Sequence, residues 1–503
     1  MLAAHPCGAR RRAGLWRAAP KCKEAAQQHK FTAATQGHMG EQHAARPIAP
    51  VRPAPIPFFS LLYFSEFSSM RFKQIWGSGL SCLALSAVTL LSACGGGSGS
   101  SSNTQVRLLN ASVGYSSLDL AVNSTTLNTG VAYGNVGSYA SVDINATSSQ
   151  IQTTGVGATV ANLTPTLAAD SHYTLIAYGW GGAVRNSLLQ ETETAPDANK
   201  SKLLVLNLAP DAGALDVYIT AANNSDSLET ATPVDSAIAG GTGSGYNTLN
   251  SGTFRITLTG SGKPSDIRLD LPSVTLESTG VATLVATATS GGRLVNGMVL
   301  KQQGAVSNLP TTKARVRVAA TLAGSASVNA SIGGQSVLPS TLAPQIGAYT
   351  TVEAGAPVLD LRVNGIALNT SNPTLKAGGD YTLLVWGTAA SPQLSVLSDD
   401  NRLPTASGTA KIRLINGLSG ANTGLGMALD YSSIASNITP GSASSAAVVN
   451  ASATASLLTV NSPASATAIY SNASLIVPTS AVFSLFMMGD PAAPIGQLVR
   501  DDR

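Results

Sequence analysis

Few residues of this chain have the side chains that catalysis needs. His172 is the only histidine after residue 94, so a Ser-His-Asp triad there would have to use it, and one histidine falls short of the ligands that a zinc site takes. The chain holds no Gly-x-Ser-x-Gly nucleophile elbow and no phosphate-binding loop. Because His172 directly precedes the apolar run that starts at Tyr173, we expect an edge or turn residue. The sequence predicts a protein that is not an enzyme and that uses no cofactor or metal.

Asp119 and Asp216 are the carboxylates that occupy equivalent places in two repeated segments. Repeated carboxylates are a candidate Ca²⁺ site, because Ca²⁺ takes oxygen ligands. Each aspartate alternates with apolar residues, however, which favours a side chain that faces solvent or caps a turn. Two further acidic pairs are expected to be solvated ends of repeats: Asp399-Asp400 and Asp501-Asp502.

Several aromatic residues stand in or beside the expected strands. Stacked rings could form a glycan-binding face, but an aromatic side chain in a strand more often packs in the core or across strands. The aromatic content of only 5% weakens the glycan interpretation. The residues concerned are Tyr178, Trp180, Tyr218, Tyr246 and Trp386.

An internal repeat must position these residues. An opening phrase, first seen as Val-Arg-Leu-Leu-Asn, recurs at spacings of 97, 113 and 96 residues, at 106–110, 203–207, 316–320 and 412–416. A closing phrase of the Tyr-Thr-Leu type recurs at 173–179, 282–288, 381–387 and 483–489. The repeats predict four domains, at 104–200, 201–311, 312–409 and 410–503.

Within each repeat, apolar and polar residues alternate with a period of two, as in Phe254–Leu258 and Leu359–Val363. This pattern is typical of half-buried strands, and Gly- and Asn-containing turns such as Asn364-Gly365 separate the runs. Repeats of about 100 residues with some seven short strands predict an all-β fold of tandem immunoglobulin-like antiparallel β-sandwich domains. The strand order is left open.

The second repeat contains Pro210-Asp211-Ala212 followed by Leu215-Asp216-Val217-Tyr218. This segment resembles the opening of a bacterial domain of unknown function, a β-rich module of secreted proteins and lipoproteins. The resemblance covers residues 104–310 well and 313–503 loosely. It implies the β-rich fold and no activity, because none is established for that family.

Charge and cysteine content divide the chain at residue 94. Residues 1–93 hold 11 of the 30 Lys and Arg residues but 3 of the 26 Asp and Glu residues. The remainder is therefore mildly acidic, which argues against nucleic-acid binding. Cys94 is the last of four cysteines, so the part that follows it has no disulfide to stabilise it.

Residues 70–93 have the features of a secretory signal: Arg71 and Lys73, then the apolar run Leu80–Leu91. The run is too short to span a bilayer. Leu91-Ser92-Ala93-Cys94 resembles the lipobox of bacterial lipoproteins, in which the signal is cut before the cysteine and the cysteine carries lipid such as palmitate. The resemblance implies lipidation of Cys94, and Gly95 resembles the outer-membrane default of that family.

Two segments flank this signal. Residues 94–103 combine the lipidated cysteine with a Gly/Ser-rich run, which is a flexible linker by composition. Residues 1–69 are rich in Arg, Ala and Pro and show no strand or helix period. We interpret them as a mis-assigned upstream extension before a start at Met70; the alternative is a basic tail with an apolar patch at 58–67.

Together these features predict an exported lipoprotein of the outer membrane, facing the periplasm or the cell surface, that is a non-enzymatic binding or structural module of the cell envelope. Its expected partners are the membrane, through the lipid on Cys94, and an envelope protein or glycan. Two alternatives stay open: a periplasm-facing accessory lipoprotein for envelope assembly, and a calcium- or carbohydrate-binding protein.

Overall fold

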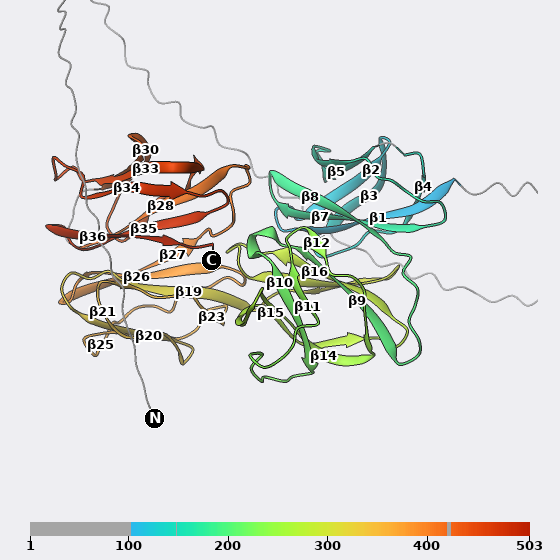
Figure 1. The fold of residues 1–503 in the computed structure, drawn as a ribbon, viewed down its shortest axis with the longest axis horizontal. Coiled ribbons are helices and arrows are strands. Elements are labelled where there is room, and N and C mark those ends of the chain that lie inside the picture. The colour runs from blue at the N-terminus through green and yellow to red at the C-terminus, as the bar shows by residue number, and fades with distance from the viewer. Residues whose placement is uncertain (1–101, 147, 420–423, 503) are drawn as a thin grey trace, which may run out of the picture. The chain divides into compact units, whose positions relative to one another are not determined.

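The computed structural model describes residues 102–146, 148–419 and 424–502. Cys94, the predicted signal, nearly all of the linker and the extension 1–69 lie outside these described residues. The described part is built from strands, with one short 3₁₀ turn and no α-helix. Among the described residues, no helix is long and apolar enough to cross a membrane. The predicted all-β fold of tandem β-sandwich domains is confirmed (Figure 1).

Four successive segments, called units 1 to 4, each form two sheets. Unit 1 has the sheets β4-β1-β7-β8 and β3-β2-β5-β6. Its strands are β1 (Asn103–Ser112), β2 (Ser117–Val122), β3 (Thr125–Ala132), β4 (Ala140–Asp143), β5 (Ser149–Thr153), β6 (Thr159–Leu163), β7 (His172–Trp180) and β8 (Ala183–Gln190).

Unit 2 repeats this arrangement with the sheets β12-β9-β16-β17-β18, in which β13 also pairs with β9, and β11-β10-β14-β15. Its elements are β9 (Lys200–Leu208), the 3₁₀ turn η1 (Pro210–Ala212), β10 (Leu215–Ala221), β11 (Asp235–Ile238), β12 (Thr242–Gly243), β13 (Asn247–Asn250), β14 (Gly252–Gly260), β15 (Lys263–Leu276), β16 (Val281–Ala288), β17 (Val295–Lys301) and β18 (Val306–Leu309).

Unit 3 has the sheets β22-β19-β26-β27, with β23 also on β19, and β21-β20-β24-β25. Its strands are β19 (Lys313–Ala320), β20 (Ser327–Ile332), β21 (Gln335–Leu342), β22 (Gln345–Ile346), β23 (Thr350–Glu353), β24 (Leu359–Val363), β25 (Ile366–Ala367), β26 (Asp380–Thr388) and β27 (Ser391–Asp399).

Unit 4 has the sheets β31-β28-β35-β36, with β32 also on β28, and β30-β29-β33-β34. Its strands are β28 (Thr409–Leu418), β29 (Leu425–Leu429), β30 (Ser432–Ile438), β31 (Ser442–Ala443), β32 (Ala447–Asn450), β33 (Ser452–Asn461), β34 (Tyr470–Val477), β35 (Val482–Asp490) and β36 (Ala493–Arg500). The predicted boundaries after residues 200, 311 and 409 stay predictions.

The opening and closing phrases of each repeat are neighbouring strands, and they run parallel. The expected antiparallel sandwich is therefore corrected to a mixed one, with a parallel pair in each unit. A parallel pair needs a long crossover, which the strands of the second sheet supply. The register is equal in all four units, because the first residues of the two phrases are opposite each other: Val106 and Tyr173, Leu203 and Ala282, Val316 and Tyr381, Ile412 and Phe483.

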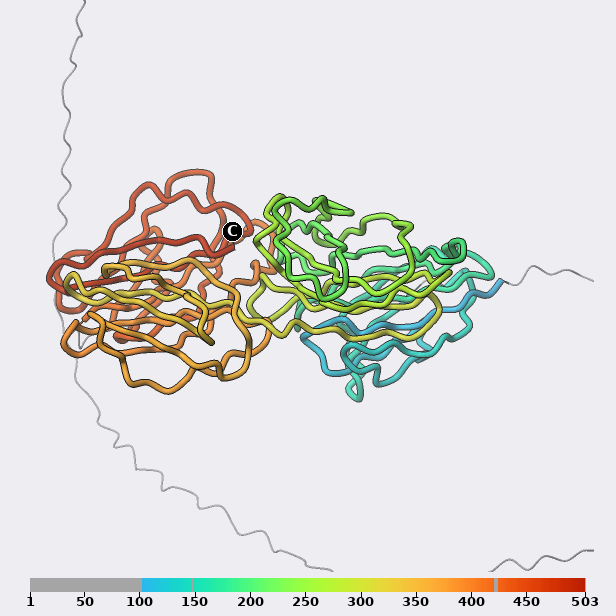
Figure 2. The backbone as a smooth tube through the Cα atoms, turned by 90° about the horizontal axis from the view of Figure 1, so that it is seen from below, coloured from blue at the N-terminus to red at the C-terminus, as the bar shows by residue number. Residues whose placement is uncertain are grey.

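The sheets that contain these parallel pairs are buried on both faces. Leu108 and Leu175 belong to the core of unit 1, whereas the adjacent Leu109 and Ile176 belong to an apolar cluster shared with unit 2. A second shared cluster joins units 3 and 4. Double burial explains why the phrases are almost continuously apolar. The strands of each unit run side by side as layers in Figure 2.

Three of the closing phrases end in a glycine for a steric reason. Gly179, Gly387 and Gly489 have φ values of 98°, 94° and 83°, a region that side chains with a Cβ rarely adopt. A Cβ on Gly179 would lie 2.8 Å from the Ala183 carbonyl oxygen. Each of these glycines is the residue before the last one of its strand, directly ahead of the hairpin to the last strand of the unit.

Candidate functional site

The charged residues of the repeat gather at four recurring positions. Because the opening and closing strands are parallel and in register, their second residues are side by side. The third position is the residue before β4, β13, β23 or β32. The fourth position, on β8, β17, β27 or β36 or directly after it, follows the residue that pairs with the first residue of the closing phrase. The four positions hold Arg107, Tyr139, Thr174 and Glu191 in unit 1; Leu204, Tyr246, Thr283 and Gln302 in unit 2; Arg317, Tyr349, Thr382 and Asp399 in unit 3; and Arg413, Ala446, Ser484 and Asp501 in unit 4.

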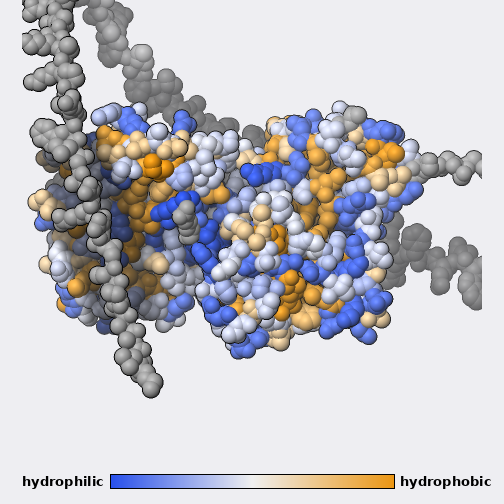
Figure 3. Space-filling view, viewed as in Figure 1, coloured by the Kyte–Doolittle hydropathy of each residue, from blue (hydrophilic) through white to orange (hydrophobic). Residues whose placement is uncertain are grey.

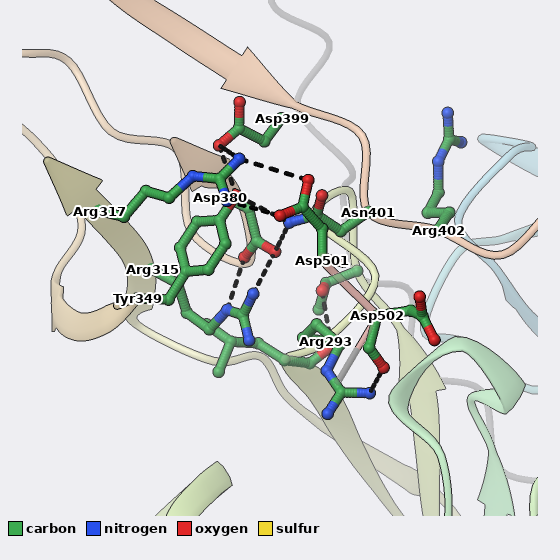
Figure 4. A network of polar contacts seen from close by, with 12 residues as sticks. Arg293, Arg315, Arg317, Tyr349, Asp380, Asp399, Asn401, Arg402, Asp501 and Asp502 are labelled. Atoms are coloured by element: carbon green, nitrogen blue, oxygen red, sulfur yellow. Dashed lines mark hydrogen bonds and ion pairs between the residues drawn. The ribbon is translucent and has the colours of Figure 1, made fainter. Parts of the chain in front are cut away.

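Arg317 of unit 3 is bound within its own unit and across to unit 4. Its Nε donates to Thr382 Oγ1 at 2.8 Å, and its second donor lies 2.5 Å from the Asp501 carboxylate of unit 4. Asp399, the acid of its own unit, is farther away, at 3.9 Å. Figure 4 shows the guanidinium of Arg317 between the two acids. The shortest ion pair of Arg317 therefore crosses the boundary between units.

Arg413 of unit 4 makes the reciprocal contacts. Its Nε donates to Ser484 Oγ at 2.7 Å, and its Nη2 forms an ion pair with Asp399 of unit 3 at 2.8 Å. Asp501, in its own unit, is 3.9 Å away. Units 3 and 4 thus exchange their acids reciprocally, and both carboxylates are fully buried.

A second layer of polar contacts lies around Tyr349. The guanidinium carbons of Arg315 and Arg317 lie 4.4 and 4.5 Å from the centre of the Tyr349 ring. The Tyr349 hydroxyl donates to Asp399 Oδ2 at 2.6 Å. Arg315 pairs with Asp380 at 2.8 Å, so the cation–π contacts and ion pairs form one continuous network.

Burial and the neighbouring charges determine how these groups titrate. Burial acts to raise the pKa of Asp399, but Arg413 and Arg317 outweigh it and the pKa lies below its usual value. Burial raises the pKa of Asp380 despite Arg315. Burial and the adjacent Asp399 hold the pKa of Tyr349 well above its usual value, so the phenol keeps its proton and donates a hydrogen bond to the carboxylate.

Unit 1 has the same cluster, but its partner unit does not. Arg107 Nε donates to Thr174 Oγ1 at 2.8 Å and Nη2 pairs with Glu191 at 3.0 Å. Tyr139 donates to Glu191 at 2.8 Å. Unit 2 contributes backbone, because Arg107 Nη1 donates to the Gly304 carbonyl at 2.7 Å. Leu204 occupies the arginine position of unit 2, so the acids cannot be exchanged here.

The two pairs of units meet through Asp211, the acid of the Pro-Asp-Ala turn. Its carboxylate accepts from Trp180 Nε1 at 2.8 Å and from the Leu403 backbone N–H at 2.9 Å. The guanidinium of Arg402 lies 4.4 Å from the centre of the Trp180 ring. Arg293 Nη1 donates to the Asp502 carbonyl at 2.8 Å. Side chains of units 1 and 2 thereby hold the 402–403 connection and the chain end.

Asp119 and Asp216 act as turn caps and are not solvated. Asp119 Oδ1 accepts from the Gly130 backbone N–H at 2.6 Å. Asp216 accepts from the backbone N–H groups of Ala237 and Gly262, both at 2.7 Å. Both aspartates are buried. The part of the expectation that placed them in solvent is wrong, because backbone donors that the bends leave unpaired need a carboxylate.

The expectation of solvated acidic ends is wrong for Asp399 and Asp501. Both belong to the fully buried, cross-paired cluster. Asp502 is also largely buried beside Arg500, and Asp400 is the most exposed of the four, with 42% of its side chain accessible. Acids at a strand end are solvated only where no neighbouring unit covers that end.

The aromatic residues lie in packed positions. Tyr178, Tyr246 and Trp386 pack in or against the clusters between units, and Trp180 packs against the core of unit 2. Tyr218 is buried. His172 is the first residue of β7, and its ring makes an edge contact with Tyr139 at 4.9 Å.

This network can hold neighbouring units together through noncovalent contacts. A carboxylate that acts as a general base must reach a substrate proton, whereas Asp399 and Asp501 are fully buried between sheets. Within the described ranges, no group of three or more His, Cys, Asp or Glu residues could hold a metal ion. The network is suited to fixing one sandwich against the next.

The arginines of the opening phrase were not among the site residues predicted from the sequence. Arg107, Arg317 and Arg413 stand at the same place in three repeats, and each has one apolar residue directly before it and two directly after it. A charged residue that recurs inside an apolar phrase was the sequence signal that could have indicated the buried ion pairs. The neighbouring unit covers the strand face that carries these arginines, and that burial is what turns them into interface residues.

Comparison with known proteins adds one family. Residues 104–218 and 314–424 each match the family described as "Domain of unknown function (DUF4397)". The matches start 210 residues apart and cover units 1 and 3 with the first strand or strands of the following unit. One match falls within each of the two expected ranges, 104–310 and 313–503, and covers part of it.

No curated protein matches the chain. Among solved structures, one titled "The Bacillus anthracis TIE protein" aligns with 77% of this chain and 68% of its own, at 8% identity and a TM-score of 0.13, which is too low to support any argument. The family matches thus support two tandem copies of a domain of unknown function, at 104–218 and 314–424.

Proposed function

We propose that the protein is a lipid-anchored, non-enzymatic module of the cell envelope at the outer membrane. The observation that carries the proposal is the use of the repeat's charged residues. Three of the four units place an arginine and an acid at the recurring positions, and these groups are buried in contacts between units. Such residues build a stiff multi-sandwich body and leave the loops for binding.

The described surface is consistent with this role. On the face in Figure 3, hydrophilic and hydrophobic residues are interspersed, as on ordinary soluble domains. The membrane anchor in this proposal is the lipid on Cys94, which rests on the Leu-Ser-Ala-Cys resemblance alone.

Membrane release tests the anchor. We expect wild-type protein in the membrane fraction of cells and Cys94→Ser in the soluble fraction, because the lipid is the proposed attachment. Ser92→Thr, two residues away, is a matched control for a change beside the processing site. Membrane retention of Cys94→Ser would contradict lipid anchoring and direct attention to the apolar patch at 58–67.

Protease treatment of intact cells tests the orientation. Loss of the body from intact cells would support a surface-exposed binding module. Protection in intact cells with digestion after lysis would favour the alternative of a periplasm-facing accessory lipoprotein for envelope assembly.

A carbohydrate-binding function is the second candidate, favoured by one cleft. Tyr178, Trp180, Arg185 and Asp211 line a hollow of about 570 Å³. Tyr178→Phe keeps the packing and removes the hydroxyl, so a glycan array with wild type and this variant tests the idea. Binding that Tyr178→Phe leaves unchanged would place any glycan elsewhere.

A further inference from the structure

A separate cleft lies between unit 2 and unit 3. It has a volume of about 580 Å³, and its walls are residues 265–270 of β15 on one side and Thr350 and Thr351 of β23 on the other. In their sheets, β15 pairs with β14 and β23 pairs with β19. The cleft is therefore open between two sheet edges and is not filled by a strand of either sheet.

Arg268 is the cation of the β15 wall, and one of its donors is unused. Its side chain is 2% exposed. Nη1 donates to the Arg293 carbonyl at 3.2 Å and Nη2 to Asp266 Oδ2 at 2.5 Å, but buried Nε has no acceptor. Buried donors in folded proteins normally have a partner. A cation that lines a cleft with a free donor indicates a missing acceptor.

The cations around this cleft also repel one another. Burial, together with the nearby Arg315, lowers the pKa of Arg268 although Asp266 opposes the change. Burial, followed by Arg268 and Arg315, lowers the pKa of Arg293 to about 10. Arg293 Nε is likewise buried without an acceptor. A further negative charge at this place would relieve the repulsion.

The acidic residues of the cleft do not supply that charge in free form. Asp266 is bound by Arg268, and Asp270 is bound by Arg255 at 2.7 Å. Lys313 completes the lining on the unit 3 side, with Glu353 as its partner. Arg315, the remaining cation of the lining, is paired with Asp380, so the unused donor among these lining cations is Nε of Arg268.

We propose that this cleft binds a small ligand through an oxyanion group, which is a carboxylate, a phosphate or a sulfate. Arg268 Nε donates to the group, and Lys313 provides the second positive charge at the solvent side. The planar guanidinium suits such oxygens, and hydroxyls of Thr311 and Thr351 in the lining suit a hydroxylated ligand body. This binding site goes beyond the proposed envelope role and does not depend on lipid anchoring.

The test is calorimetric titration of the folded wild-type protein with inorganic phosphate, sulfate and acetate, at constant ionic strength maintained with chloride. We expect saturable binding of at least one of these probes, and the one bound most tightly identifies the oxyanion class. Arg268→Gln should weaken that binding about tenfold or more, because a charge-assisted hydrogen bond is lost.

Two further variants make the result decisive. Lys313→Gln changes a partly exposed position and should weaken binding without disturbing a core. If Arg268→Gln fails to fold, the affinity of Lys313→Gln tests the proposal. Arg362→Gln is the matched control, because Arg362 lies in an exposed pair with Asp360 outside the cleft. Absence of binding by wild type, or equal binding by wild type and Lys313→Gln, would overturn the proposal.

Discussion

The interface between units 1 and 2 and that between units 3 and 4 use the same strands in the same register but different chemistry. Among the described residues, the first has eleven buried apolar side chains and the second five. The second compensates with two arginine–aspartate pairs exchanged between units, where the first has one arginine–glutamate pair. Two units with the same backbone arrangement can therefore be held together mainly by apolar burial or mainly by buried charge.

Leu204 and Arg413 show how a single position determines the type of interface. Both are the second residue of an opening phrase. Leucine contributes apolar area, whereas arginine requires an acid opposite and a hydroxyl beside it. Unit 2 also lacks the acid, because Gln302 occupies that position. Both charged residues of the pair are therefore replaced by uncharged ones in this unit.

Removing one charge from the exchanged pairs should have the largest effect. Arg317→Ala leaves two buried acids with a weakened set of partners, and breaking a buried pair costs about 3–5 kcal/mol. Denaturant unfolding and hydrogen exchange should show the loss in β28 and β35, with little change in β1 and β7. A loss spread evenly over all four units would contradict separate interfaces.

Asp211→Ala should weaken the contact between the two pairs of units. It leaves the Trp180 indole N–H and the Leu403 N–H without their acceptor, and an unsatisfied buried donor costs about 1–3 kcal/mol. Scanning calorimetry should then resolve two transitions farther apart than in wild type. An unchanged profile would show that this junction does not couple the pairs.

Copying unit 2 into unit 4 should be tolerated better than one charge deletion. The double variant Arg413→Leu/Asp501→Gln leaves Arg317 with Asp399, which imitates the single pair of unit 1. Because the variant removes one charge of each sign and the remaining Arg317 and Asp399 can pair with each other, no buried charge is left without a partner, and we expect stability within about 2 kcal/mol of wild type. A double variant less stable than Arg317→Ala would refute the equivalence of the two interfaces.

Acid should weaken the interface of units 3 and 4 in a defined range. The pKa of Asp399 in the fold lies below its usual value, and that of Asp400 is about 2, because burial is outweighed by Arg402 and Lys411. Their stabilisation is complete above the unfolded pKa of about 3.9 and is lost as pH falls through the folded pKa. The raised pKa of Asp380 has the opposite sign and offsets part of the loss.

Unfolding midpoints measured between neutral pH and pH 2 test this dependence. Asp400→Asn should have a shallower decline at the acid end than wild type, since it removes one of the groups with a lowered pKa. An identical decline in both proteins would exclude Asp400 as a source of acid sensitivity.

The smallest effect is expected for Arg362→Ala. Arg362 and Asp360 are 46% and 47% exposed, and exposed ion pairs contribute about 0–1 kcal/mol. Its unfolding curve should nearly coincide with that of wild type. A loss comparable to that of Arg317→Ala would mean that burial does not explain the difference between these pairs.

The sequence predicted the strands and sandwiches because alternation and turn residues are local signals. The phrases at 106–110 and 173–179 were found, but their parallel pairing was not, since pairing depends on where the crossover places the strand. The burial of Asp399 and Asp501 could not be predicted either. This burial depends on a second unit that covers the strand ends. The repeated sequence does not reveal which faces of the units are in contact.

The most direct test of the account is a double-mutant cycle between Arg317 and Asp501, which lie 184 residues apart in sequence and 2.5 Å apart in the structure. The stabilities of wild type, Arg317→Met, Asp501→Asn and the double variant give their coupling, with Arg362 and Asp360 as the exposed reference pair. If buried exchanged charges join units 3 and 4, the coupling exceeds that of the reference pair by about 1 kcal/mol or more. Equal coupling in both pairs would contradict the account.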